Sequence, residues 1–200
     1  MAYSESDQWE LDTRDIWEIH FDTRSQCSGY WHDKSCHLET AAQILWNSYS
    51  SGTNGLYDAG ATYRMLMGMS FELLFKSFCV ANSKEFSPTH NLPQLACQAG
   101  FQLEDKEQKI FSILSGYIYW EGRYPVPKPI NTKKKKVSGA EGIKQQWWPF
   151  CNAVYEEGQN FIEEEPAIPS TLNRSDLDYE NLFKLWQKFN QHYVDKHIAT

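Results

Sequence analysis

Basic side chains gather in one window of the chain, where they could bind phosphate. Between Arg123 and Lys144 there are seven basic residues and one acid, Glu141, so in a chain of net charge −7 this window carries +6 and the remainder −13. A guanidinium suits two-pronged contact with phosphate, and lysines add point charges. An acidic chain with one basic segment would bind an anion at one place. We therefore predict anion contacts from five residues of this window: Arg123, Lys133, Lys134, Lys135 and Lys136.

Two aromatic residues flank this arginine and could stack on a nucleobase. Trp120 lies about one helical turn before Arg123, and Tyr124 follows it directly in "YWEGRYP". Aromatic rings stack on the unpaired bases of single-stranded RNA. A structural explanation is also available, because a cation at a helix C-terminus is favoured by the helix dipole and can stack on aromatic neighbours. For the lysines, the corresponding alternative is a solvated run on a loop.

A polar stripe follows one face of the most apolar helical segment. Four residues spaced four apart within the run 59–83 form it: Arg64, Gly68, Glu72 and Lys76. A glutamate that precedes a lysine by four residues forms a favourable ion pair on a helix. We expect Glu72 and Lys76 either to form an ion pair within a bundle or dimer interface, or to bind the ligand.

Four residues of metal-ligating type lie close together near the N-terminus. In "CSGYWHDKSCH" they are Cys27, His32, Cys36 and His37. Their spacing matches no standard zinc pattern, since there is no Cys-x-x-Cys pair and Cys36 directly precedes His37. We therefore expect ordinary packing, no metal and reduced thiols. Because no glycine-rich phosphate loop or similar motif is present, we also expect no cofactor.

Helical periodicity dominates the chain from residue 35 onward. Apolar residues recur three or four apart between breaks rich in glycine and proline, which predicts helices over 35–49, 59–83, 87–100, 105–122, 140–163 and 176–197. We predict an all-α fold, an antiparallel up-and-down helical bundle of about five helices over residues 35–200. Residues 1–34 are expected to form an N-terminal arm packed on this bundle, in which Trp17, Ile19 and Phe21 alternate as in a short strand.

Composition narrows the class of protein. A hydrophobic fraction of 41%, with 15% aromatic residues, is typical of a globular protein rather than a disordered one. The longest apolar runs are too short to span a bilayer, and the acidic N-terminus lacks the apolar segment of a secretory signal. We expect a cytoplasmic protein that does not contact membranes.

Four motifs taken together resemble the HEPN domain (higher eukaryotes and prokaryotes nucleotide-binding). The family has a Gly-Leu-Tyr turn, then a long helix with Glu and, four residues on, Lys. A Thr-His-Asp/Asn-Leu element and a helix ending in Arg-Tyr-Pro follow. This chain matches them in order and spacing, over roughly residues 36–125, with Gly55-Leu56-Tyr57, Glu72 and Lys76, Thr89-His90-Asn91-Leu92, and Arg123-Tyr124-Pro125.

The resemblance implies a helical bundle that is commonly a homodimer. Many members of the family act on RNA in toxin–antitoxin or phage-defence systems. Others bind nucleotides or assist a partner nucleotidyltransferase. Nuclease members carry a histidine four to six residues after the arginine, and the two promote attack of a ribose 2′-hydroxyl on the adjacent phosphate. No histidine follows Arg123 at that spacing, so the best candidate for a general acid or base is His90.

We therefore expect a HEPN-like homodimer, in a prokaryotic defence or toxin–antitoxin setting, that binds RNA or a nucleotide phosphate. Arg123 and the neighbouring lysines would contact the anion, and Tyr124 or Trp120 would stack on a base. Two alternatives stay open. In one, the chain is a metal-independent endoribonuclease in which His90 replaces the missing histidine. In the other, it is a non-catalytic bundle that pairs with another protein, such as a nucleotidyltransferase.

Overall fold

The computed structural model describes residues 15–52, 59–121, 131–132, 135–136 and 172–198. The α-helices in these ranges are α1 (Ile16–Gln26), α2 (Ser28–Ser50), α3 (Gly60–Ala81), α4 (Leu92–Ala99), α5 (Asp105–Gly116) and α7 (Tyr179–His197). A π-helical turn, η2 (Tyr117–Glu121), continues α5, and a 3₁₀ turn, η3 (Arg174–Leu177), precedes α7. Two short strands, β1 (Asn131–Thr132) and β2 (Lys135–Lys136), pair antiparallel.

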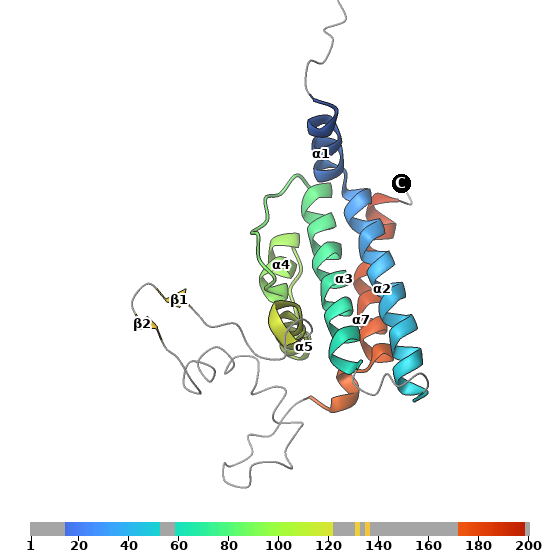
Figure 1. Cartoon of the computed structure of the whole chain (residues 1–200). Helices are drawn as coiled ribbons and strands as arrows, with labels where there is room; N and C mark the ends of the chain where they lie inside the picture. The colour runs from blue at the N-terminus through green and yellow to red at the C-terminus, as the bar shows by residue number, and fades with distance from the viewer. Residues whose placement is uncertain (1–14, 53–58, 122–130, 133–134, 137–171, 199–200) are drawn as a thin grey trace, which may run out of the picture.

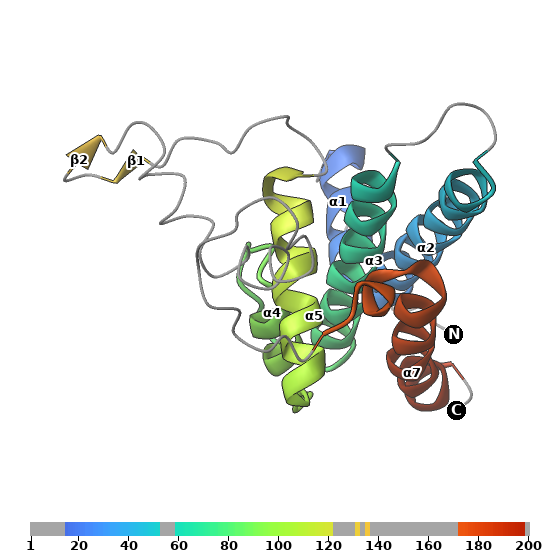
Figure 2. The same ribbon diagram turned by 90° about the horizontal axis from the view of Figure 1, so that it is seen from below.

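Four of the helices form an up-and-down bundle, which confirms the predicted all-α fold (Figure 1). In chain order α2, α3, α5 and α7 alternate in direction, and the short α4 lies in the connection between α3 and α5. Seen from below, α3 lies between α5 on one side and α2 on the other (Figure 2). This central position gives α3 contact with every other helix of the bundle, as its nearly all-round apolar sequence requires.

Aromatic side chains fill the centre of the bundle. Phe189 of α7 lies edge-on to Phe75 of α3, with ring centroids 5.3 Å apart, and 5.8 Å from Phe111 of α5. Phe71 and Phe75 each make a further edge-to-face pair with Phe111, at 4.9 and 5.3 Å. Such pairs stabilise a core beyond the burial of their area. One cluster of rings therefore joins three helices.

A pair of buried serines fixes α2 against α3. Ser35 Oγ donates to the carbonyl oxygen of Ser70 over 2.7 Å, and Ser70 Oγ donates to that of Ser35 over 2.8 Å. Trp186 of α7 adds a donation from Nε1 to Ser35 Oγ at 3.3 Å. Because buried polar groups are costly without partners, sliding one helix along the other would break these bonds. The serines thus specify one register of the helices.

At Gly68, α3 packs tightly against η2 and the end of α5. A Cβ atom on this residue would lie 2.8 Å from Ile118 Cγ1 and 3.1 Å from the carbonyl oxygen of Leu114. Real Cβ atoms essentially never come that close to another atom, so a side chain here would force the two segments apart. The glycine in the predicted polar stripe therefore has a packing role, and it lets η2 lie directly on α3.

The N-terminal segment differs from the sequence prediction. Trp17, Ile19 and Phe21 lie in helix α1, although their alternation is like that of a short strand. The Asp15 carboxylate accepts a hydrogen bond from Trp17 N and caps the helix, and Trp17 and Phe21 also satisfy the helical spacing of four. No residue of α1 is buried, and the helix extends beyond one end of the bundle (Figure 1).

Helix α2 also departs from the expected boundaries. It begins at Ser28, so the predicted junction between arm and bundle at residues 34–35 falls inside a continuous helix. The short predicted helix over 87–100 begins later, at Leu92, where Asn91 Oδ1 accepts from Gln94 N. Gly100, with φ of 99°, ends it in the left-handed conformation. The helix predicted over 140–163, like residues 1–14 of the arm, lies outside the described residues.

Among the described helices, none combines the length and the apolar character needed to cross a membrane.

Candidate functional site

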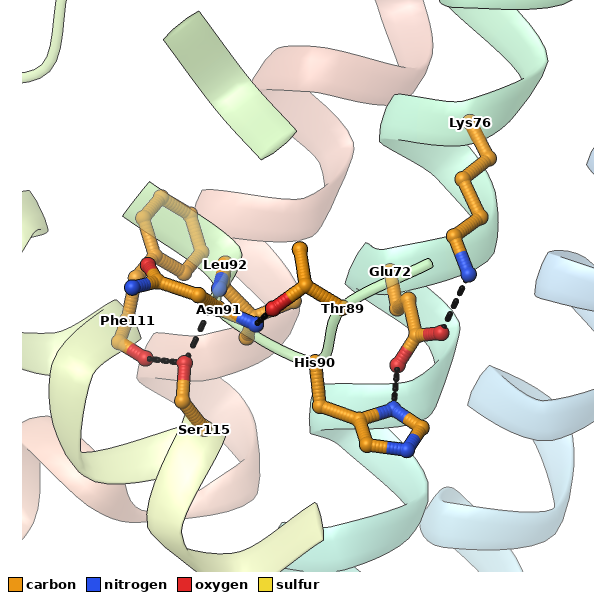
Figure 3. A network of polar contacts seen from close by, with 8 residues as sticks. All are labelled: Glu72, Lys76, Thr89, His90, Asn91, Leu92, Phe111 and Ser115. Carbon is orange, nitrogen blue, oxygen red and sulfur yellow. Dashed lines mark hydrogen bonds and ion pairs between the residues drawn. The ribbon is translucent and has the colours of Figure 1, made fainter. Parts of the chain in front are cut away.

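The structure brings together three of the residues singled out by the sequence: Glu72, Lys76 and His90. Glu72 lies in the middle of α3, and its two carboxylate oxygens have different partners (Figure 3). Oε1 accepts from Lys76 Nζ over 2.6 Å, and Oε2 from His90 Nδ1 over 2.8 Å. Only 9% of the Glu72 side chain and 12% of the Lys76 side chain are exposed, whereas 43% of His90 is. We call this group the Glu72 cluster.

The segment that carries His90 is anchored on both sides of the histidine. Before it, Thr89 Oγ1 accepts a hydrogen bond from Asn91 N over 3.1 Å. After it, Leu92 N donates to Ser115 Oγ of α5 over 2.9 Å, and that hydroxyl donates in turn to the carbonyl oxygen of Phe111 (Figure 3). Leu92 itself is fully buried. These contacts explain why threonine, asparagine and leucine surround the histidine: they fix its backbone between α3 and α5.

The hydrogen bond to Glu72 determines which nitrogen of His90 carries a proton. A carboxylate accepts only, so Nδ1 must donate, and in the neutral ring Nε2 is then an acceptor. Nε2 makes no hydrogen bond to any described residue. A carboxylate that holds an imidazole by one nitrogen and leaves the other accessible is the arrangement used for general acid and base catalysis. The cluster therefore offers one oriented proton acceptor at the surface.

Charge in the cluster depends on this same imidazole. Glu72 and Lys76 neutralise each other, and the Lys76 ammonium also lies 5.5 Å from the centre of the Phe86 ring. A neutral His90 leaves the cluster without net charge, and a protonated one makes it cationic. The Glu72–Lys76 pair is thus the predicted helix ion pair, and it positions a third, more exposed group.

The first residue of the polar stripe, Arg64, belongs to a separate site two turns away along α3. Its Nε donates to the carbonyl oxygen of Leu177 over 3.3 Å and its Nη1 to Tyr117 Oη of η2 over 3.4 Å. Burial disfavours the cation, but the fields of Tyr117, Tyr63 and Asp178 outweigh it and raise the pKa of Arg64. The guanidinium also lies over the Tyr63 and Tyr117 rings, at 5.2 and 5.7 Å. Arg64 therefore links η2 to η3, the turn that precedes α7.

Most of the predicted anion and stacking residues lie outside the described residues. These are Arg123, Tyr124, Lys133 and Lys134. Trp120 lies in η2 and Lys135 and Lys136 in β2, where the structure describes the backbone only. Their role as ligand contacts stays a prediction, as does the approach of His90 to Arg123.

Of the four potential metal ligands of the N-terminal region, the structure brings two together: Cys36 Sγ lies 3.8 Å from His32 Nε2, one helical turn away. His32 is buried, with Nε2 2.7 Å from Asn190 Oδ1 and its ring stacked on Tyr193 at 4.3 Å. Burial, and after it the charges of Asp33 and Glu39, raises the pKa of the Cys36 thiol, which disfavours the thiolate that binds metals. Within the described parts of the chain, no three side chains of metal-ligating type form a group. Cys27 and His37 are exposed.

Glu72, Lys76 and His90 were identified from the sequence, but the residues that hold them in place, Ser115 and Phe86, were not. Ser115, which holds the His90 segment on α5, is one serine on a buried helical face. The sequence signal for such a contact is a hydroxyl among apolar residues, because a buried hydroxyl needs a hydrogen-bond partner. Phe86, beside Lys76, lies in a loop without periodicity.

Comparison with protein-family models, with curated proteins and with solved structures found no match to the chain.

Proposed function

We propose that the chain is a HEPN-like domain that binds RNA or a nucleotide phosphate, as its four motifs suggest. The observation that supports this most is the Glu72 cluster, because it joins residues of two motifs at hydrogen-bond distance: His90 follows Glu72 by 18 positions and Lys76 by 14. The backbone that carries His90 is held on α5 by the hydrogen bond from Leu92 N to Ser115 Oγ, and Arg123 follows η2, the continuation of α5, in the sequence after one intervening residue. A basic segment in the sequence together with an oriented imidazole suits a phosphate-bearing ligand.

The proposal predicts a specific change in salt dependence. Replacing Arg123 and Lys133–Lys136 with alanine is expected to weaken RNA binding and to flatten its dependence on salt, because each phosphate contact on a single strand contributes about 0.7 to the logarithmic slope. Fluorescence anisotropy with labelled single-stranded RNA at several salt concentrations measures both. A variant with five exposed lysines elsewhere changed to alanine, namely Lys84, Lys106, Lys109, Lys184 and Lys196, controls for total charge. Equal binding and slope in the basic-window variant and the wild type would refute the assignment.

A second function, metal-independent RNA cleavage, is favoured by the orientation of His90. In this reaction Nε2 accepts the proton of a ribose 2′-hydroxyl, and the oxygen attacks the adjacent phosphorus. The bond from phosphorus to the 5′ oxygen breaks, that oxygen takes up a proton, and a 2′,3′-cyclic phosphate remains. Glu72 holds the ring so that Nε2 is the accessible acceptor.

Incubation with RNA in EDTA tests this second function. We expect cleavage products ending in a cyclic phosphate, and a loss of at least about a hundredfold in rate for His90→Ala, the usual effect of removing a general acid or base. His37→Ala, which changes an exposed histidine on α2, is the matched control and should keep the wild-type rate. Absence of cleavage at high protein concentration, or cleavage that survives His90→Ala, would rule out this mechanism.

A further inference from the structure

An open groove lies where α1 meets α2 and α3, with a volume of about 660 Å³. This size falls in the range of small-ligand sites in proteins. Four aromatic residues line it, namely Trp17, Phe21, Tyr30 and Trp31. They include the most exposed large apolar side chains of this region, with Trp17 75% and Phe21 71% exposed. Aromatic rings left open to solvent together, rather than singly, mark a surface that binds something.

The charged residues of the groove all have the same sign. Arg24 and Lys34 line it beside His20, and no aspartate or glutamate is among its described lining residues. In a chain with 26 acidic and 19 basic residues, this is a local reversal of the overall charge. Stacking surfaces together with cations, without carboxylates, suit a ligand that is both aromatic and anionic.

Helix geometry explains how α1 produces this surface. Trp17, His20, Phe21 and Arg24 follow the spacing of three and four that puts residues on one face of a helix. The acidic residues of α1, Glu18 and Asp22, lie about 100° and 140° around the helix from Trp17 and leave the groove face cationic.

The side of the groove formed by α2 is held in place by specific contacts. Trp31 donates from Nε1 to the carbonyl oxygen of Ser25 over 3.1 Å, and its ring lies edge-on to Phe86 at 5.5 Å. The Arg24 guanidinium lies 5.9 Å from the centre of the Tyr30 ring. Tyr30 and Trp31 are therefore positioned on α2 before any ligand binds, which limits the entropy lost on that side of the groove.

A continuous series of contacts connects this groove to the Glu72 cluster. Trp31 contacts Phe86, the Phe86 ring lies beside the Lys76 ammonium, and Lys76 and His90 share the carboxylate of Glu72. Leu73, the residue after Glu72 on α3, lines the groove itself. The two sites are thus linked through Phe86 and through adjacent positions of α3.

We propose that the groove binds an unpaired nucleotide of a single-stranded RNA whose other part lies at the Glu72 cluster. The base stacks on the aromatic residues, and Arg24 and Lys34 contact the phosphate. This inference rests on the proposed RNA-binding function and adds that the substrate is single-stranded, because the bases of a duplex are stacked on one another and not accessible. The open shape of the groove suits a strand, whereas a free small ligand is usually enclosed over most of its surface.

A second copy of the chain is a poorer occupant of this groove. In a symmetric contact the same patch faces itself, which would bring two sets of Arg24 and Lys34 together with no carboxylate from the described lining of the groove between them. Like charges placed opposite each other in an interface are unfavourable. The charge of the groove therefore favours an anion over self-association.

Two groove variants test the proposal by different routes. Trp17→Ala/Phe21→Ala removes stacking surface, and Arg24→Ala/Lys34→Ala removes charge. All four side chains are exposed, so we expect both variants to keep the wild-type urea midpoint. The stacking variant should bind an oligouridylate about tenfold more weakly or worse, as expected for a lost stacked base. The charge variant should lower the logarithmic salt slope by about 1.4.

Controls separate this proposal from the others. Ile44→Ala/Tyr119→Ala, two exposed apolar residues away from the groove, should bind the oligouridylate as the wild type does. If the wild type does not bind RNA, the proposed function fails and this inference with it. If the wild type binds, Arg123→Ala with the lysine substitutions weakens binding and both groove variants bind normally, only the groove assignment is overturned. Two further outcomes would overturn the groove assignment. One is a shift from dimer to monomer in the stacking variant. The other is that the wild type binds AMP alone as tightly as it binds the oligouridylate.

Discussion

Replacing Phe189 with alanine is expected to lower the free energy of unfolding by about 3–5 kcal/mol, the range found for removing a buried phenylalanine. Its ring is only 2% exposed and contacts Phe75 and Phe111, so its loss leaves a cavity where three helices meet. The surrounding rings come from different helices and cannot close such a cavity without moving the backbone. Urea unfolding followed by far-ultraviolet circular dichroism measures the effect.

The control for this substitution is Ile44→Ala on α2. That side chain is 63% exposed, and we expect its removal to change the free energy of unfolding by no more than about 0.5 kcal/mol. If Phe189→Ala cost less than about 1.5 kcal/mol, the rings would have to repack readily, contrary to the interlocked cluster described above.

The second large effect is expected from Glu72→Gln. This change keeps the shape of the side chain but leaves the Lys76 ammonium, almost enclosed, without its counter-charge. Removing one partner of a buried ion pair typically costs about 3 kcal/mol or more, because the remaining charge is desolvated and unpaired. It also removes the carboxylate that fixes the proton of His90 on Nδ1. We therefore expect a lower free energy of unfolding in urea, together with weaker RNA binding or slower RNA cleavage.

A double variant distinguishes these two consequences. In Glu72→Gln/Lys76→Met the unpaired charge is gone and the apolar stem that packs near Phe86 is kept, so most of the lost stability should return. Any function that depends on the Glu72–His90 contact should stay impaired. Equal stability of the single and double variants would contradict the idea that the cost comes from the Lys76 charge.

The bundle was predictable because its helices carry strong local signals. Apolar residues of α3 recur at helical spacing through more than six turns, and α4 has an asparagine cap and a terminal glycine. The polar stripe of α3 likewise predicted the Glu72–Lys76 pair, since residues four apart on a helix are neighbours. Periodicity and capping are local properties, and the sequence records them directly.

Contacts between segments far apart in the sequence were harder to predict. His90 reaches Glu72 because Leu92 is anchored on Ser115 of α5, a relation across three segments that no spacing encodes. Helix α1 was not predicted within the N-terminal arm, because Trp17, Ile19 and Phe21 alternate as in a strand and only Trp17 and Phe21 have helical spacing. The groove was missed for the same reason, since its face appears only when residues 17–24 are helical.

The lack of any buried residue in α1 separates its thermodynamics from those of the bundle. An isolated helix of 11 residues is marginal in water, so α1 can unwind while the aromatic core stays intact. A ligand held against this helix must offset the entropy of keeping it wound, and the measured affinity includes that cost. Thr23 lies in α1 but does not line the groove. A substitution there that raises helix propensity should therefore strengthen ligand binding without touching the ligand.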